Sequence, residues 1–131
     1  MIIISEAEFR EKISSDLSTL TGFDYVVGPG RSGAIAAVYA SHIMGLPFLP
    51  YKCKIPNKTP LIVDTAMQSG RTLRKASRLY NDAEFYYAYR EPPRVRFWYE
   101  APSIIRGIGN EYPMSNISKK LGNIPMVGAV K

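Results

Sequence analysis

The order of hydrophobic and polar residues along this chain predicts helices and strands in alternation. In the stretch 5–20, apolar side chains recur at helical spacing behind a Ser-x-x-Glu capping box, so this segment is expected to be a helix with one buried face. A β-branched and aromatic run at 23–27 predicts a strand, and the alanine-rich stretch 34–44, closed by Gly45, predicts a second helix.

The remaining pattern repeats this order of elements. Four further strands are expected, at 48–51, 61–63, 84–89 and 95–99. The second of these ends at Asp64, and a polar turn after it starts a helix that runs to about Tyr80. Because strand–turn–helix units alternate, the sequence predicts an α/β fold with a mainly parallel sheet flanked by helices, a three-layer, Rossmann-like architecture.

Length and composition fit a single globular domain. The 131 residues are 46% hydrophobic and 21% charged, which argues against disorder. The core is expected at about 5–100, with the irregular stretch 101–131 as cover over the sheet edge or the site. No apolar run approaches the ~20 residues that span a bilayer, the first residues lack a signal-peptide pattern, and the single cysteine, Cys53, cannot form an internal disulfide. We therefore expect a cytoplasmic protein with no membrane partner.

The net charge of +6 points to an anionic partner. Nucleic acids, membrane surfaces and phosphorylated small molecules all fit such a charge. The basic residues form no block of five or more, but cluster around two glycine-containing turns and in the stretch 52–58. This distribution favours separate phosphate groups over a long polyanion. Nucleic-acid binding through the basic surface remains an alternative, with a steep salt dependence as its mark.

The first of these turns, 28–33 (GPGRSG), has the spacing GxGxxG between a predicted strand and a predicted helix. A dinucleotide site would also need an acidic residue about 20 positions later, but 51–54 (YKCK) stand there. A Walker loop would need Lys-Ser/Thr where 34–35 are Ala-Ile. Either the glycines only let the strand and the helix pack closely, or the turn binds an anion at the helix start. The residues that would bind it are Gly30, Arg31 and Ser32.

The second turn lies in the segment 61–73 (LIVDTAMQSGRTL), where an apolar strand leads to an acid and then to a loop that opens a helix. This segment resembles the signature with which type I phosphoribosyltransferases bind phosphoribosyl pyrophosphate (PRPP): an apolar strand, one or two acids, then Thr/Ser-Gly-x-Thr. The resemblance covers about 5–100 and is loosely nearest to the purine or xanthine-guanine type. It implies a transferase that uses PRPP and a nitrogenous base to give a nucleoside monophosphate and pyrophosphate.

The resemblance also implies roles for the residues of this segment. Asp64 would be the catalytic residue, binding the ribose hydroxyls or a Mg²⁺ cofactor, which prefers carboxylate oxygens and water. The 5′-phosphate of PRPP would lie at the helix start, where backbone N–H groups and the helix dipole attract anions. The residues that would bind it are Gln68, Ser69, Gly70, Arg71 and Thr72.

Two further groups of contacts follow from the resemblance. The pyrophosphate would be bound by Gly30, Arg31, Ser32 and Lys52. The stretch 52–58 would add positive charge over this leaving group. Trp98, in an aromatic strand that ends in an acid, would stack on the base; the other interpretation is that it packs in the core.

Three departures from the signature keep a second function open. Thr65 stands in place of a second acid, Gln68 in place of the carboxylate of 6-oxopurine enzymes, and the stretch 52–60 is shorter than the closing loop of the family. A non-catalytic PRPP or nucleotide sensor or regulator on the same fold is therefore the alternative to the enzyme. In either case we expect PRPP and a nucleobase as partners, with a homodimer as a candidate assembly.

Overall fold

The computed structural model describes residues 2–81 and 83–100, so the cover expected at 101–131 lies outside the described residues. The fold presented here is that of one compact unit, which ends at Trp98. Its elements follow one another as β1 (Ile2–Ile4), α1 (Glu6–Leu17), β2 (Tyr25–Val27), α2 (Gly30–Met44), β3 (Pro60–Met67), α3 (Arg71–Leu79), β4 (Glu84–Arg90) and β5 (Val95–Phe97). None of these helices has the length and apolar character needed to cross a membrane.

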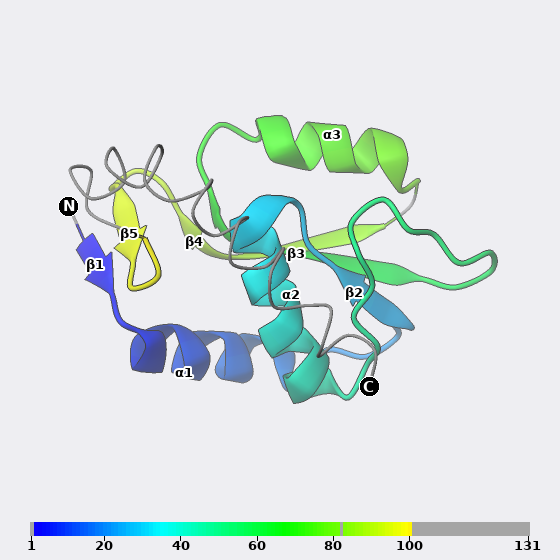
Figure 1. Ribbon diagram of the computed structural model, residues 1–131, viewed down its shortest axis with the longest axis horizontal. Helices are drawn as coiled ribbons and strands as arrows, with labels where there is room; N and C mark the ends of the chain where they lie inside the picture. The colour runs from blue at the N-terminus through cyan, green and yellow to red at the C-terminus, as the bar shows by residue number, and fades with distance from the viewer. Residues whose placement is uncertain (1, 82, 101–131) are drawn as a thin grey trace, which may run out of the picture. The chain divides into compact units, whose positions relative to one another are not determined.

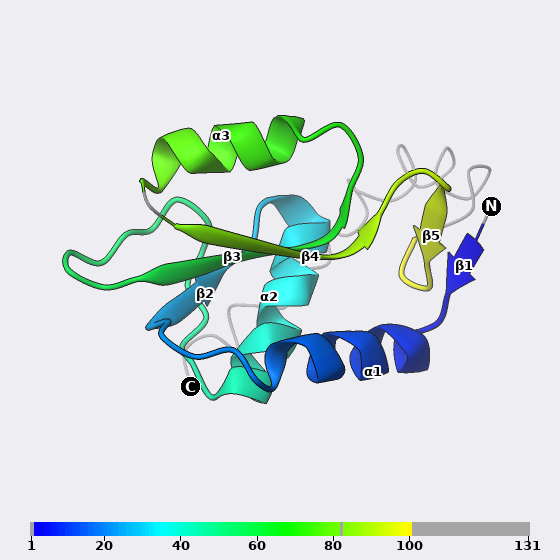
Figure 2. The same ribbon diagram turned by 180° about the vertical axis from the view of Figure 1, so that it is seen from behind.

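Parallel strands form the centre of this unit. β2, β3 and β4 make a parallel sheet in the order β2-β3-β4, and β1 pairs with β5 in a separate parallel ladder. α1 and α2 lie on one face of the three-stranded sheet and α3 lies on the other, as Figure 1 shows and Figure 2 repeats from behind. The predicted α/β class, with a parallel sheet flanked by helices, is confirmed.

Buried side chains on both faces of β3 hold these layers together. On the α3 side, Ile62 packs in a cluster with Tyr25 of β2 and with Ala76 and Tyr80. On the other side, α2 buries a row of alanines, whose small side chains let a helix lie close to a sheet; they are Ala36, Ala37 and Ala40. Burial on both faces explains why β2 and β3 are almost continuously apolar in sequence.

α1 forms as its capping box predicts. The Ser5 hydroxyl accepts a hydrogen bond from the backbone N–H of Glu8, and the Glu8 carboxylate accepts one from the N–H of Ser5, both at 3.1 Å. The buried face is the predicted one: Phe9, Ile13 and Leu17. The helix ends at Leu17 and not at Leu20, whose side chain is 39% exposed. The predicted helix was too long because Leu20 is apolar and has helical spacing, although it lies beyond the last turn that packs on the core.

Three strand predictions need correction. The strand predicted at 48–51 contributes one isolated bridge, to β2. The strand predicted to end at Asp64 continues to Met67, because β4 runs beside it and pairs with it that far. The last strand ends earlier than predicted, at Phe97. Asp64 therefore lies within β3, where its backbone is held in a ladder, and the loop to α3 begins only after Met67.

Candidate functional site

The turn 28–33 lies directly against β3. β2 is shorter than β3 at its carboxyl end, so the turn that follows β2 comes to lie beside the later residues of β3. A side chain has no room here, because a Cβ on Gly28 would lie 1.8 Å from the carbonyl oxygen of Gly33 and 2.9 Å from that of Val63. The close-packing interpretation of the glycines therefore holds for Gly28 and Gly33.

The middle of the same turn borders a cavity. α2 begins at Gly30, four residues earlier than predicted, and Gly30 has a φ of +68°, a conformation that favours glycine. A cavity of about 400 Å³ opens at this helix start. Its lining consists of Pro29, Gly30, Arg31, Ser32, Asp64 and Thr72. The first glycine turn thus shares a cavity with the acid of the second motif.

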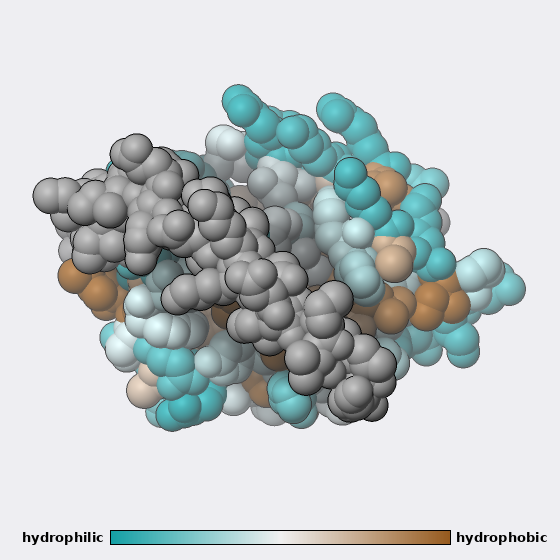
Figure 3. All heavy atoms as spheres, viewed as in Figure 1, coloured by the Kyte–Doolittle hydropathy of each residue, from teal (hydrophilic) through white to brown (hydrophobic). Residues whose placement is uncertain are grey.

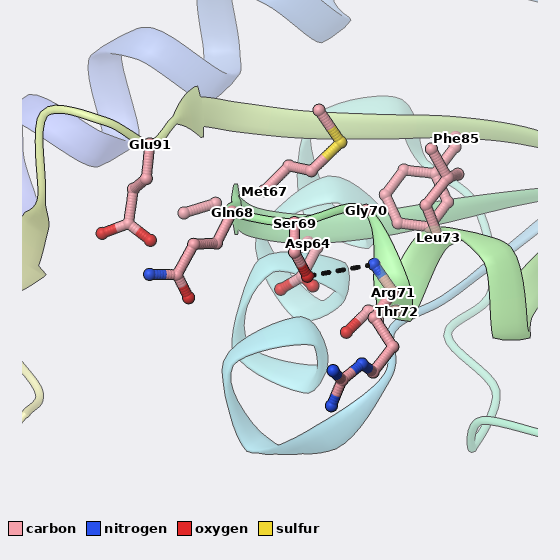
Figure 4. Close-up of a pocket in the computed structure, with 11 residues that line it drawn as sticks. Asp64, Met67, Gln68, Ser69, Gly70, Arg71, Thr72, Leu73, Phe85 and Glu91 are labelled. Carbon is pink, nitrogen blue, oxygen red and sulfur yellow. Dashed lines mark hydrogen bonds between the residues drawn. The ribbon is translucent and has the colours of Figure 1, made fainter.

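A second cavity, of about 270 Å³, lies at the start of α3 (Figure 4). It is lined by the end of β3, the loop 68–72 and the first residues of α3, together with Phe85 and Glu91. Asp64 and Thr72 line both cavities. The two turns that the sequence singles out, far apart along the chain, therefore meet at Asp64.

α2 and α3 both start without the features that stabilise the start of α1. α1 has its Ser5 cap and acidic residues in its first turn, as the helix dipole favours. In α2 and α3 the N-cap residues, Pro29 and Gly70, make no side-chain capping hydrogen bond, and neither first turn has an acidic residue; Arg31 and Arg71 stand there instead. Backbone N–H groups next to a positive charge are suited to a bound anion. Both helix starts at this site therefore fit phosphate groups.

Gly70 sets the direction in which the loop 68–72 enters α3. It precedes the helix with φ 82° and ψ 2°, in the left-handed region. The Ser69 hydroxyl accepts a hydrogen bond from the N–H of Arg71 at 3.4 Å, drawn as the dashed line in Figure 4. A Cβ on Gly70 would lie 3.3 Å from a guanidinium nitrogen of Arg74. The loop is thus a compact turn in which glycine is the residue that fits.

The outer side of α3 adds positive charge around this site. Four of its exposed side chains are basic: Arg71, Arg74, Lys75 and Arg78. In Figure 3, hydrophilic side chains gather at the top of the view, over α3. Charge of one sign near a cavity raises the local concentration of anions and their rate of arrival. The excess of basic residues in the sequence is therefore partly concentrated beside the second turn.

The carboxyl group of Asp64 is poorly hydrated. Burial raises the pKa of Asp64 from 3.8 to about 6, and the hydrogen bond that its Oδ1 accepts from the N–H of Thr65, at 2.7 Å, partly opposes this increase. Burying a carboxylate costs free energy unless a partner stabilises the charge. Asp64 is thus prepared for a ligand that brings hydroxyl groups or a cation.

Asp64 also fits a magnesium ion that is bound mainly through a substrate. Within residues 2–81 and 83–100, no three His, Cys, Asp or Glu side chains are grouped as a metal site. Mg²⁺ is usually bound by one or two carboxylates, with waters and substrate phosphates as its other ligands. One carboxylate between two helix starts suited to phosphate matches that ligand set.

Titration of Asp64 should make the metal-free protein less stable as the pH rises from about 4 to about 6. Between 3.8 and about 6 the folded protein keeps the proton on Asp64 and the unfolded chain has lost it, so raising the pH favours unfolding. At ~1.4 kcal/mol per pH unit, the free energy of unfolding should fall by on the order of 2 to 3 kcal/mol. Urea unfolding in EDTA measures this loss as the difference between the parent and Asp64→Asn. An identical pH dependence in the two proteins would contradict the prediction.

Comparisons with known proteins bear on the fold. The sequence matches no protein-family model and no curated protein. Among solved structures, a purine phosphoribosyltransferase from Pyrococcus horikoshii Ot3 matches with a TM-score of 0.59 and 24% identity, over 78% of this chain and 97% of that one. A xanthine-guanine-hypoxanthine phosphoribosyltransferase from Helicobacter pylori matches with a TM-score of 0.60 and 16% identity, over 83% and 97%.

This chain has the type I phosphoribosyltransferase fold. The resemblance inferred from the segment 61–73 is thereby confirmed at the level of fold. At identities below 25% the likeness is one of fold. The roles of individual residues therefore depend on the geometry of the site.

The phosphoribosyltransferase fold brings together most of the residues predicted for the site. Those that line one or both cavities are Gly30, Arg31, Ser32, Asp64, Gln68, Ser69, Gly70, Arg71 and Thr72. Lys52 and Trp98 line neither of these cavities. The residues of the two turns and Asp64 thus lie around the same two cavities, and Lys52 and Trp98 lie elsewhere.

The stretch that contains Lys52 is attached at the opposite end of the sheet. The Tyr80 hydroxyl accepts a hydrogen bond from the N–H of Lys52 at 2.6 Å and donates one to the carbonyl of Cys53 at 2.8 Å. The Tyr25 hydroxyl accepts one from the N–H of Ile55 at 3.3 Å. These tyrosines lie at the amino end of β2 and the carboxyl end of α3, away from the cavities. The stretch 52–58 therefore lies at the end of the sheet opposite to the two cavities.

Trp98 packs against the helices on the other face of the sheet. Its ring lies 5.6 Å from that of Phe9 in α1 and 6.3 Å from that of Tyr39 in α2, between centroids. Side chains two residues apart on a strand point to the same face of the sheet. Asp64 therefore lies on the face of β3 where Ile62 packs toward α3, which is opposite to the face that Trp98 covers. Trp98 is 37% exposed, so it packs against α1 and α2 at the surface and not within the core.

Glu91 lines the cavity at the start of α3 and was not among the predicted site residues. It directly follows β4, the neighbour of β3 in the parallel sheet. The carboxyl ends of parallel strands meet at one edge, where ligands of such sheets bind. An acid immediately after the strand predicted at 84–89 is thus a pattern in the sequence from which Glu91 could have been found.

Proposed function

We propose that this chain is a magnesium-dependent phosphoribosyltransferase, which transfers the phosphoribosyl group of PRPP to a nitrogenous base. The observation that carries this proposal is the position of Asp64 between two helix starts that lack caps and acids and carry arginines. PRPP has the complementary chemistry, because its ribose bears a phosphate on one side and a pyrophosphate on the other. The names of the two matching structures support the same class of reaction.

In this proposal each part of the site binds one part of PRPP. The loop 68–72 binds the 5′-phosphate, the turn 30–32 binds the pyrophosphate, and Asp64 binds the ribose hydroxyls between them. Magnesium, held by Asp64 together with substrate oxygens and water, would supply positive charge to the pyrophosphate. Holding both ends of PRPP fixes the ribose carbon C1′ for attack, which removes much of the entropic barrier.

The transfer breaks one bond at C1′ and forms another. The C1′–O bond breaks and its electron pair leaves with the pyrophosphate, while the lone pair of a ring nitrogen of the base forms the new C1′–N bond. The proton of that ring nitrogen is released to water. Arg31 and the N–H groups at the start of α2 stabilise the leaving negative charge, and the carboxylate of Asp64 stabilises the positive charge that develops on the sugar.

The position of 52–58 favours a second candidate, a PRPP-binding sensor without turnover. Type I phosphoribosyltransferases are expected to close a loop over the substrate, whereas this stretch is tied to Tyr25 and Tyr80. A site without a closing loop leaves the reaction open to water. Binding of PRPP without transfer would be the activity of such a module.

Pyrophosphate release distinguishes the two candidates. The full chain is incubated with PRPP, Mg²⁺ and a panel of purine and pyrimidine bases, and PRPP binding is measured separately by calorimetry. Release that depends on one base supports the enzyme, and binding without release for any base supports the sensor. Failure of the parent protein to bind PRPP would overturn both.

Replacing Gly70 by alanine should weaken PRPP binding about fivefold. The left-handed φ and the contact with Arg74 at 3.3 Å oppose a side chain at this position, so the start of α3 should shift away from its phosphate-binding geometry. Gly45→Ala is the matched control, because Gly45 also has a left-handed φ, of +69°, at the far end of α2 with nothing within 4 Å. Calorimetry should show the loss only for Gly70→Ala, and equal PRPP affinities of the two variants would remove Gly70 from the site.

A further inference from the structure

One charged side chain in the cavity at the start of α3 has no part in the proposed binding of PRPP. Glu91 follows β4, and its backbone N–H donates a hydrogen bond of 2.9 Å to the carbonyl of Met67, which continues the pairing of β3 and β4. Its Oε2 accepts a hydrogen bond of 2.7 Å from the N–H of Val95. The backbone and the carboxylate of Glu91 are thus both fixed, at the border of a cavity that Asp64 also lines.

The two ends of this cavity differ in chemistry. Figure 4 shows Glu91 and Gln68 at one end and Leu73 and Phe85 at the other, with Asp64 between them. A carboxylate repels phosphate groups, so the 5′-phosphate would lie toward the part of the loop formed by residues 70–72 and not beside Glu91. The pyrophosphate turn 30–32 borders the other cavity, which Glu91 does not line. The part of the reacting complex that remains for the Glu91 end is the base.

The hydrogen-bonding capacity of Glu91 restricts which base fits. An ionised carboxylate only accepts hydrogen bonds. Among the residues that the structure describes, Val95 is the one hydrogen-bond partner of the Glu91 side chain, so Oε1 remains for a ligand. A base that turned a carbonyl oxygen toward Glu91 would place two acceptors against each other, whereas an amino group would donate to it.

We propose that Glu91 selects the acceptor, so that the base is one whose exocyclic amino group donates a hydrogen bond to its carboxylate. The proposal rests on the proposed function, since it concerns the base that receives the phosphoribosyl group. A base that turns an oxo group toward Glu91 loses this hydrogen bond and adds the repulsion between two acceptors, and such a mismatch discriminates between otherwise similar ligands. The chain should therefore distinguish amino from oxo bases of otherwise equal shape.

Matched pairs of bases test this selection in the parent protein. Adenine and hypoxanthine differ by amino or oxo at position 6, guanine and xanthine at position 2, and cytosine and uracil at position 4. Binding of each base to the protein with PRPP and Mg²⁺ is measured by calorimetry, and transfer by pyrophosphate release. In the pair that the site accepts best, the amino member should be preferred tenfold or more. Equal use of both members, or preference for the oxo member, would overturn the proposal.

The isosteric variant Glu91→Gln gives a sharper test. The N–H of Val95 should keep the amide oxygen of the new side chain in the place of Oε2, so that its NH₂ group takes the place of Oε1 and donates. The preference should then fall by tenfold or more and move toward the oxo base. Glu84→Gln, at the exposed start of the same strand, should leave it unchanged. An unchanged preference in Glu91→Gln would overturn the assignment.

PRPP affinity separates this proposal from the one on which it rests. Glu91→Gln should bind PRPP with Mg²⁺ within about twofold of the parent. Absence of PRPP binding in the parent overturns the proposed function and the selection together. PRPP binding that is normal in the parent but lost in Glu91→Gln would place Glu91 on the metal or the phosphates, and would overturn the selection alone.

Discussion

Replacing Asp64 by asparagine should stabilise the metal-free protein at pH 7.5 and weaken its binding of PRPP. At this pH the carboxyl group, with a pKa of about 6, is ionised although it is largely buried. Removing the charge should therefore raise the free energy of unfolding by on the order of 2 to 3 kcal/mol. Asparagine still offers an oxygen to the N–H of Thr65, so the local hydrogen bond of 2.7 Å is kept. Loss of the charge that binds the ribose and its magnesium should lower PRPP affinity tenfold or more, equivalent to ~1.4 kcal/mol.

The two effects have opposite signs, which distinguishes a ligand-binding role from a structural one. Urea unfolding in EDTA gives the stability, and calorimetric titration of PRPP with Mg²⁺ gives the affinity. Glu84→Gln removes a charge from an exposed residue and should change neither quantity. An Asp64→Asn protein that unfolds more easily would assign Asp64 a stabilising role, and one that binds PRPP like the parent would remove it from the site.

Replacing Gly28 by alanine should destabilise the protein by about 3 kcal/mol, through overpacking that the backbone must absorb. The new Cβ would meet backbone atoms on two sides, at 1.8 Å in the turn and at 2.9 Å in β3, and backbone cannot rotate away as a side chain can. The turn 28–33 should therefore move off β3. Because that turn forms one side of the site at Asp64, PRPP affinity should fall as well.

Gly22→Ala is the control for this substitution. Gly22, unlike Gly28, has a positive φ, of +95°, and a Cβ there would meet nothing within 4 Å. Its replacement should cost only the backbone strain, about 1 kcal/mol, and leave PRPP binding unchanged. Chemical denaturation of both variants measures the difference. Equal losses of stability in the two variants would contradict the close contact between the turn and β3.

Local patterns were sufficient to predict the three helices, the strands β2 to β5 and the two turns, but not β1, whose partner is the distant β5. The Ser-x-x-Glu cap set the start of α1, the apolar run set β3, and the glycines and Asp64 marked the turns. Each of these depends on residues that are near one another in sequence. The parallel order of β2, β3 and β4 then brings the two turns to one edge, as alternation of strands and helices implies.

The predictions that differ depend on contacts between distant parts of the chain. The end of β3 is set by pairing with β4, and the position of Lys52 is set by a hydrogen bond to Tyr80. Trp98 lies where the rings of α1 and α2 hold it. None of these partners can be read from neighbouring residues. Glu91 differs from these residues, because its position directly after a predicted strand can be read from the sequence. It was not predicted because it belongs to no recognised motif.

The missing caps of α2 and α3 bear on what the native state of this protein is. A helix start that lacks a capping side chain is completed by whatever else accepts its N–H groups. Here the two incomplete starts and the charged Asp64 all belong to one site, so a single ligand could satisfy all three. Such a ligand would supply hydrogen bonds and charge that the side chains of the protein do not. Without this ligand the protein is folded, but the N-cap residues of both helices supply no side-chain acceptor to the N–H groups at the helix starts. Its natural ligand can therefore be sought as the compound that most raises the melting temperature of the protein.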